Sequence, residues 1–127
     1  MPHPIMFDDA DPLLARVREI ALAFPEATEV VAHGRPTFRC GKVFAHYGGS
    51  VKGGDRRDHS VLVKPDAAEA RALVADPRFF VPAYLGPAGW IGLDLDAAAP
   101  DWDEVRELVD ASFRLVAPAR LVRDLEF

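Results

Sequence analysis

Seven cations in the middle third of the sequence are the residues best suited to contact an anionic partner. They are Arg35, Arg39, Lys42, Lys52, Arg56, Arg57 and Lys64. Only Asp55 and Asp58 oppose them between residues 35 and 64, which gives this segment a balance of +5. The rest of the chain holds eight basic and eighteen acidic residues, a balance of −10. This separation predicts a folded molecule with one basic region on an otherwise acidic surface.

The densest cationic stretch is also rich in glycine. Residues 48–55 contain four glycines and Lys52, and Arg56 and Arg57 follow directly. Contacts from Lys and Arg to phosphates provide sequence-independent affinity for nucleic acids, and a β-ribbon can lie in a groove of the duplex. We therefore predict nucleic-acid binding through this stretch, with the other four cations extending the basic surface. The alternative is an ordinary solvated loop, and the Gly-Lys-Ser/Thr of a nucleotide-binding P-loop is absent.

A second group of candidate residues comes from segments 33–38 and 84–90, which place aromatic and glycine residues beside Arg35. Aromatic rings next to cations can stack on bases or line a protein-binding pocket. These segments therefore predict a small-ligand pocket whose candidate residues are His33, Thr37, Tyr84 and Trp90. The alternative for the aromatic residues is simple packing in the core.

No catalytic or metal-binding constellation is visible in the sequence. A nucleophilic Cys40 would need a base, a group to orient that base and donors for an oxyanion, and a buried small hydrophobe is the more typical role for a lone cysteine. The four histidines lack metal-ligand spacing; they are His3, His33, His46 and His59. We expect no enzymatic activity, no metal and no cofactor.

The hydrophobic pattern predicts one domain over residues 1–127, with helices at 12–24, 66–75 and 100–117. Strands are predicted at 37–40, 43–47, 59–64 and 90–95, with a short extended segment at 29–31. The prolines of segment 77–87 predict a rigid loop packed on the sheet rather than a strand. Short turns between strands and one-sided helices predict a two-layer α+β sandwich, an antiparallel sheet with helices on one face. The other face would be partly open to water or a partner.

The first predicted hairpin joins the strands at 37–40 and 43–47. A two-residue turn at Gly41-Lys42 pairs Cys40 with Val43 and Phe38 with Ala45. It also places Arg39 and Phe44 together on one face. Apolar residues then occupy both faces, so the pattern leaves open which face is the core.

Five segments of the chain resemble the MmcQ/YjbR family. They are PEATE (25–29), HGRPTFR (33–39), GKVFA (41–45), YLGPAGW (84–90) and LVDASFRLVAP (108–118). The resemblance covers nearly the whole chain and implies a CyaY-like fold with DNA binding through a "double wing" of hairpins. No enzymatic activity is generally attributed to the family. Phe113 stands where the family often has Tyr, and the loop at 52–58 is richer in glycine and arginine than is usual.

The remaining expectations concern location and partners. The chain has no run of 18 apolar residues and no signal-peptide pattern at its start, and its one cysteine cannot form an intrachain disulfide. We expect a cytoplasmic protein without a membrane partner. DNA is the expected partner, another protein bound to the open sheet face is the alternative, and the expected state is a monomer or a weak dimer.

Overall fold

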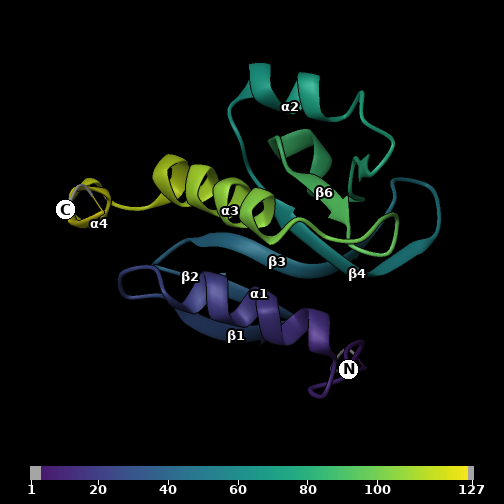
Figure 1. Cartoon of the computed structure of the whole chain (residues 1–127), viewed down its shortest axis with the longest axis horizontal. Helices are drawn as coiled ribbons and strands as arrows, with labels where there is room; N and C mark the ends of the chain where they lie inside the picture. The colour runs from purple at the N-terminus through teal and green to yellow at the C-terminus, as the bar shows by residue number, and fades with distance from the viewer. Residues whose placement is uncertain (1–3, 126–127) are drawn as a thin grey trace.

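The computed structural model describes residues 4–125. Within them, six strands form one antiparallel sheet in the order β1-β2-β3-β4-β6-β5 (Figure 1). The strands are β1 (Thr28–Ala32), β2 (Arg35–Arg39), β3 (Val43–Ser50), β4 (Arg56–Val63), β5 (Phe79–Phe80) and β6 (Ile91–Asp94). The helices are α1 (Pro12–Leu22), α2 (Ala67–Leu73), α3 (Trp102–Val116) and α4 (Ala119–Asp124).

All four helices contribute side chains to one core on a single face of the sheet. In Figure 1, α1 and α3 lie on the near side of the strands, and both helices contact the central strands β3 and β4. A smaller cluster of Leu62, Phe80 and Trp90 lies on the opposite face. The predicted two-layer α+β architecture with helices on one face is therefore confirmed.

The helices begin where the capping residues predict. Asp11 accepts a hydrogen bond from the backbone N–H of Leu13 (2.9 Å), and Asp66 accepts one from Glu69 (2.9 Å). Asp101 caps α3 in the same way. These side chains satisfy backbone donors that a helix leaves unpaired at its first turn.

Three short elements were not predicted. Helix α4 follows Pro118, and the segment expected to be only a loop contributes the two-residue edge strand β5 and a 3-10 helix, η1 (Gly86–Ala88). The β1–β2 turn was also missed. His33 and Gly34 both have positive φ, 53° and 81°, which a type I′ turn requires and which Gly and His adopt more readily than most residues.

The β2–β3 hairpin contains a β-bulge that the sequence did not predict. Phe38 pairs with Ala45 as expected, but Val43 pairs with Arg39 and not with Cys40. Phe44 is therefore an extra residue in β3. Phe44 and Ala45 both join the helix-side core, whereas Arg39 lines a cavity on the other face. The prediction that Arg39 and Phe44 share a face is wrong for this reason.

Ser112 of α3 satisfies the backbone beside the bulge. Its hydroxyl donates to the carbonyl of Phe44 (2.6 Å) and accepts from the N–H of Lys64 (2.9 Å), and Ser112 is fully buried. One side chain therefore joins α3 to both central strands. The rings of Phe24, Phe44 and Phe113 pack together next to it, with centroids 4.9–5.8 Å apart.

Asp11 joins α1 to the sheet from the other end. Besides capping the helix, its carboxylate accepts a hydrogen bond from the hydroxyl of buried Tyr47. His59 lies 3.6 Å from the same carboxylate and contacts Asp96 at 2.7 Å. These contacts fix the packing of α1 across β3 and β4.

Replacing Ser112 by alanine should destabilise the protein by about 1–3 kcal/mol, because the Phe44 carbonyl and the Lys64 N–H lose their buried partner. Urea unfolding measures this change. Ser50→Ala is the matched control, since no hydrogen bond of the Ser50 hydroxyl is found within residues 4–125, and it should change stability by less than about 0.5 kcal/mol. Equal effects of the two substitutions would contradict the proposed bridge.

Candidate functional site

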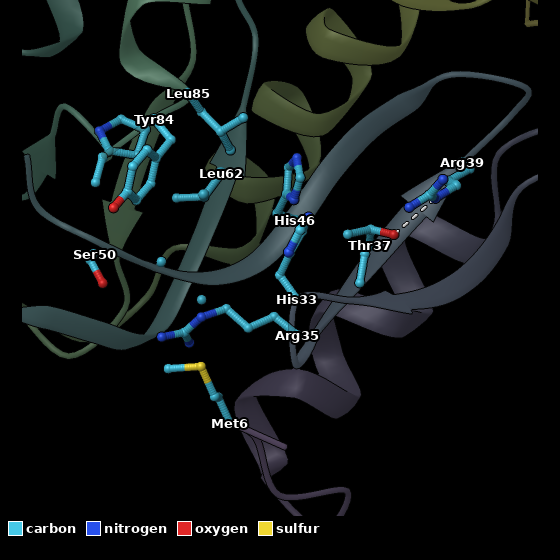
Figure 2. A pocket seen from close by; sticks show the side chains of 15 residues that line it. Met6, His33, Arg35, Thr37, Arg39, His46, Ser50, Leu62, Tyr84 and Leu85 are labelled. Carbon is cyan, nitrogen blue, oxygen red and sulfur yellow. Dashed lines mark hydrogen bonds between the residues drawn. The ribbon is translucent and has the colours of Figure 1, made fainter. Parts of the chain in front are cut away.

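The face of the sheet opposite the helices carries a pocket of about 760 Å³ (Figure 2). Its floor comes from β2, β3 and Leu62 of β4, and its walls come from Met6 and the loop residues Pro82–Leu85. Arg39 and Thr37 lie towards one end and Tyr84 and Ser50 towards the other, with His33, Arg35 and His46 between them (Figure 2). Leu62 and Leu85 lie nearer to Tyr84 than to Arg39 (Figure 2).

The alternation of β2 places its polar residues in the pocket. Arg35, Thr37 and Arg39 point to the open face, whereas Phe38 points into the helix-side core. Successive side chains of a strand point to opposite faces of a sheet. The bulge at Phe44 keeps this alternation compatible with β3, so that His46, the partner of Thr37, also faces the pocket.

Both walls are fixed by backbone hydrogen bonds. The N–H of Ala83 donates to the carbonyl of Ser50 (2.8 Å), and the N–H of Lys52 donates to the carbonyl of Val81 (3.0 Å). On the other side, the N–H of Met6 donates to the carbonyl of Gly34 (2.9 Å). The pocket is therefore formed before any ligand arrives.

Tyr84 is the most exposed aromatic residue at the rim. Its side chain is 98% exposed, and its backbone lies in the left-handed region with a φ of 67°. This conformation is uncommon and strained for an aromatic residue. An exposed ring held in such a conformation beside a pocket is available to cover a bound ligand.

Arg39 is held in place through only one of its nitrogens. Its Nε donates to the hydroxyl of Thr37 (3.0 Å), and that hydroxyl donates to the carbonyl of Val30 (2.6 Å). Within residues 4–125, no carboxylate lies in ion-pairing distance of Arg39. The two terminal nitrogens of Arg39 remain available to an acceptor in the pocket.

Arg35 differs from Arg39 because its charge is buried and paired. Its Nη2 lies 2.9 Å from a carboxylate oxygen of Asp58, and the side chain is only 11% exposed. Neither Nη1 nor Nη2 has a well-aligned hydrogen bond within the described residues. A Cβ on Gly48 would lie 2.3 Å from Nη1, so the guanidinium fits only because residue 48 is glycine. Arg35 lines the floor without presenting its nitrogens to a ligand.

His46 is a neutral imidazole that packs against the edge of Trp90, with ring centroids 4.8 Å apart. Burial, together with the charges of Arg39 and His33, lowers the pKa of His46 to about 4. No hydrogen bond of its ring to another side chain is found in the described part of the chain. The ring therefore has hydrogen-bonding capacity for a pocket ligand.

The predicted basic surface does not form as one patch. Arg39 pairs with one end of β3 and Arg56 with the other, Val43 and Ser50 respectively, which places them on the order of 20 Å apart at the rise of a β-strand. Lys42 and Lys52 are exposed in separate turns, and Lys64 is half-buried at the end of β4.

Carboxylates also lie in ion-pairing distance of the two arginines that follow the glycine-rich loop, although Asp58 is shared between Arg56 and Arg35. Arg56 pairs with Asp58 at 3.1 Å. Arg57 lies 3.5 Å from Asp94 of β6 and 3.9 Å from Asp55. Because their charges are partly compensated, these two arginines should attract a phosphate less strongly than the sequence alone indicates.

Three of the four residues predicted for a pocket lie at this cavity. His33, Thr37 and Tyr84 line it, whereas Trp90 is 8% exposed and lies behind His46. The prediction missed Met6, Leu62 and Leu85, which are ordinary apolar residues in the sequence. Arg35 and Arg39, which the sequence predicted for a nucleic-acid surface, also line this pocket.

Other candidate chemistry finds little geometric support. Cys40 is buried, and burial raises the pKa of its thiol. Among residues 4–125, no group of three or more His, Cys, Asp or Glu side chains is placed to hold a metal ion. Over the same residues, no helix combines the length and apolarity needed to cross a membrane.

Fold and site together define a two-layer α+β domain with a ligand-sized pocket on the uncovered face of its sheet. A YjbR family model matches residues 22–115, which include all six strands. The chain therefore belongs to the YjbR family. The crystal structure of Deinococcus radiodurans protein DR2400, with a DUF419 domain, is similar with a TM-score of 0.68 and 17% identity, over 100% of this chain and 91% of that one. At this identity the likeness shows the fold alone. No curated protein matches the sequence.

The pKa of His46 makes a testable difference to stability. The native state resists protonation of this ring, so between about pH 4 and pH 6.5 the unfolded chain binds more protons, and stability falls as the pH falls. We expect NMR to give His46 a pKa near 4. From pH 7 to pH 4, the wild type should lose up to about 3 kcal/mol more than His46→Gln.

His59 is the control for this experiment. Its hydrogen bond with Asp96 raises its pKa, so its contribution to stability is present at low pH and is lost as the pH rises through that pKa. His59→Gln should therefore destabilise the protein more at pH 5.5 than at pH 8.5. A pKa of His46 near 6.5 would contradict the electrostatics described for the pocket.

Proposed function

We propose that this protein binds a small organic ligand in the pocket on the open face of its sheet. The observation that carries the proposal is the cavity itself, a preformed space of about 760 Å³. Small-molecule sites typically measure roughly 300–1,000 Å³ and are mostly apolar, with a few polar groups that orient the ligand. Leu62, Leu85 and Met6 supply apolar surface here, and Arg39 and His46 supply the polar groups.

The contrast between the two arginines of the floor supports this proposal. Arg35 is paired with Asp58, as is usual for a buried charge. Arg39 faces the same cavity without a carboxylate among the described residues. A cation left without a partner inside a cavity is suited to an acceptor that comes from outside.

Binding of nucleic acid is a second proposal, and its support is narrower. The resemblance implies a double wing of hairpins, and the β3–β4 loop exposes Lys52. Its two arginines, however, are engaged by carboxylates. A protein partner on the open face and a cytoplasmic location also remain predictions from the sequence.

A fragment screen followed by ¹H–¹⁵N NMR tests small-ligand binding directly. Bound fragments should shift resonances of pocket residues such as Thr37, His46 and Ser50. Ala83→Phe fills the pocket from its wall and should weaken binding at least tenfold. Ala72→Phe places the same ring on exposed helix α2, and it should leave affinity unchanged. Hits that survive Ala83→Phe, or an absence of hits in the pocket, would refute the proposal.

A salt titration with duplex DNA tests the second proposal. Contacts to phosphates make affinity fall steeply with salt. Because Arg56 and Arg57 are already paired, we expect their double replacement by alanine to change any DNA affinity less than about twofold. A much larger loss, together with a steep salt dependence, would favour the nucleic-acid proposal over the present one for this surface.

A further inference from the structure

We propose that the pocket ligand is a small amphipathic monoanion, an organic acid whose carboxylate contacts Arg39 and His46 and whose apolar body lies along Leu62, Leu85 and Tyr84. The inference rests on the proposed function and names the class of ligand for that site. It follows from the charge of the pocket, the direction of its donors and the character of its walls.

The charge count favours a single negative charge. Arg39 is the one arginine of the pocket with no carboxylate in ion-pairing distance within the described residues, whereas Arg35 is paired with Asp58, a carboxylate that it shares with Arg56 outside the pocket. The Nη atoms of Arg35 are also buried. A ligand with two or more negative charges would bring uncompensated charge into a partly apolar cavity, which is costly. One carboxylate balances one guanidinium.

The orientation of Arg39 suits a carboxylate. The hydrogen bond to Thr37 uses only the Nε of Arg39 (Figure 2). Both terminal nitrogens are left for an acceptor, and a guanidinium binds a carboxylate through two parallel hydrogen bonds. Thr37 is a positioning residue, because its hydroxyl is already bonded to both Arg39 and Val30.

His46 is the cross-strand partner of Thr37 and so lies next to the end of the pocket that holds Arg39. As a neutral imidazole it can donate one hydrogen bond to the carboxylate. The ionisable groups that face it are Arg39 and His33, and Trp90 packs behind it. A bound anion would oppose the two cationic influences, so binding should raise the pKa of His46.

The rest of the cavity suits an apolar body. Leu62 lies in the floor, and Leu85 and Tyr84 lie in the wall away from Arg39 (Figure 2). The exposed ring of Tyr84 is placed to stack on a flat group. An aromatic acid with one or two rings matches both ends of the pocket.

Three probes with the same ring system separate charge from shape: 2-naphthoate, neutral 2-naphthamide and dianionic 2-naphthyl phosphate. Calorimetry and NMR at pH 7 should show 2-naphthoate binding at least tenfold tighter than either of the others. Arg39→Gln should abolish the preference for 2-naphthoate over the amide while changing the affinity of the amide less than twofold. Lys42→Gln removes a neighbouring cation outside the pocket, and it should leave the preference intact.

The titration of His46 supplies a second readout. Saturating 2-naphthoate should raise its pKa by at least one unit, and 2-naphthamide should not. Equal affinities of acid and amide, or a preference that survives Arg39→Gln, would overturn the ligand class and leave the proposed function standing. If none of the three probes shifts pocket resonances at millimolar concentration, the ligand class is refuted, and the fragment screen then decides the proposed function separately.

Discussion

The extra residue at Phe44 is the constraint on which the rest of this structure depends. Without it, strict alternation would place Val43 and Ala45 on one face and Phe44 on the other. Phe44 and Ala45 could then not both enter the helix-side core. With it, Phe44 and Ala45 both enter the helix-side core, while Val43 and His46 remain on the open side. The cost of a bulge is a disturbed hydrogen-bond ladder, and Ser112 offsets that cost by accepting and donating at the disturbed point. A core contact of α3 therefore determines which side chains reach the pocket on the far side of the sheet.

Part of the open face of the sheet is covered by the loop before β6 and by the N-terminal segment. The loop before β6 folds over Leu62 and packs Phe80 and Trp90 into a second small cluster. The isolated bridge between Val51 and Pro82 ties this loop to the end of β3. The pocket lies between this loop and the N-terminal segment at Met6. Arg35 marks the border, because its paired guanidinium fills the space that a side chain on residue 48 would otherwise take.

The sequence correctly predicted the helices whose first turn is fixed by a neighbouring capping residue. Asp11, Asp66 and Asp101 predicted three helix starts because a cap and its helix are neighbours in the chain. The sequence could not predict the bulge, because both faces of β3 carry apolar residues and the parity alone is ambiguous. It also misjudged the basic region. Arg39 and Arg57 belong to the same basic segment of the sequence and were predicted to lie in one patch. In the antiparallel sheet they pair with opposite ends of β3. The carboxylate that lies beside Arg57 belongs to Asp94, thirty-seven residues further along the chain.

Electrostatics at two length scales separates the two proposed modes of binding. The chain as a whole is acidic, with a net charge of −5, and at long range it repels any anion, a nucleic acid most of all. A basic patch that binds nucleic acid has to outweigh this repulsion over a wide surface. The carboxylates beside Arg56 and Arg57 lower the positive charge that such a patch would have. Arg39 acts differently, because it acts within contact distance and inside a cavity, where screening by salt is weaker than at an exposed surface. A single, locally uncompensated cation in an acidic protein is poor at collecting polyanions, yet it is sufficient to hold one carboxylate whose apolar remainder is buried alongside it.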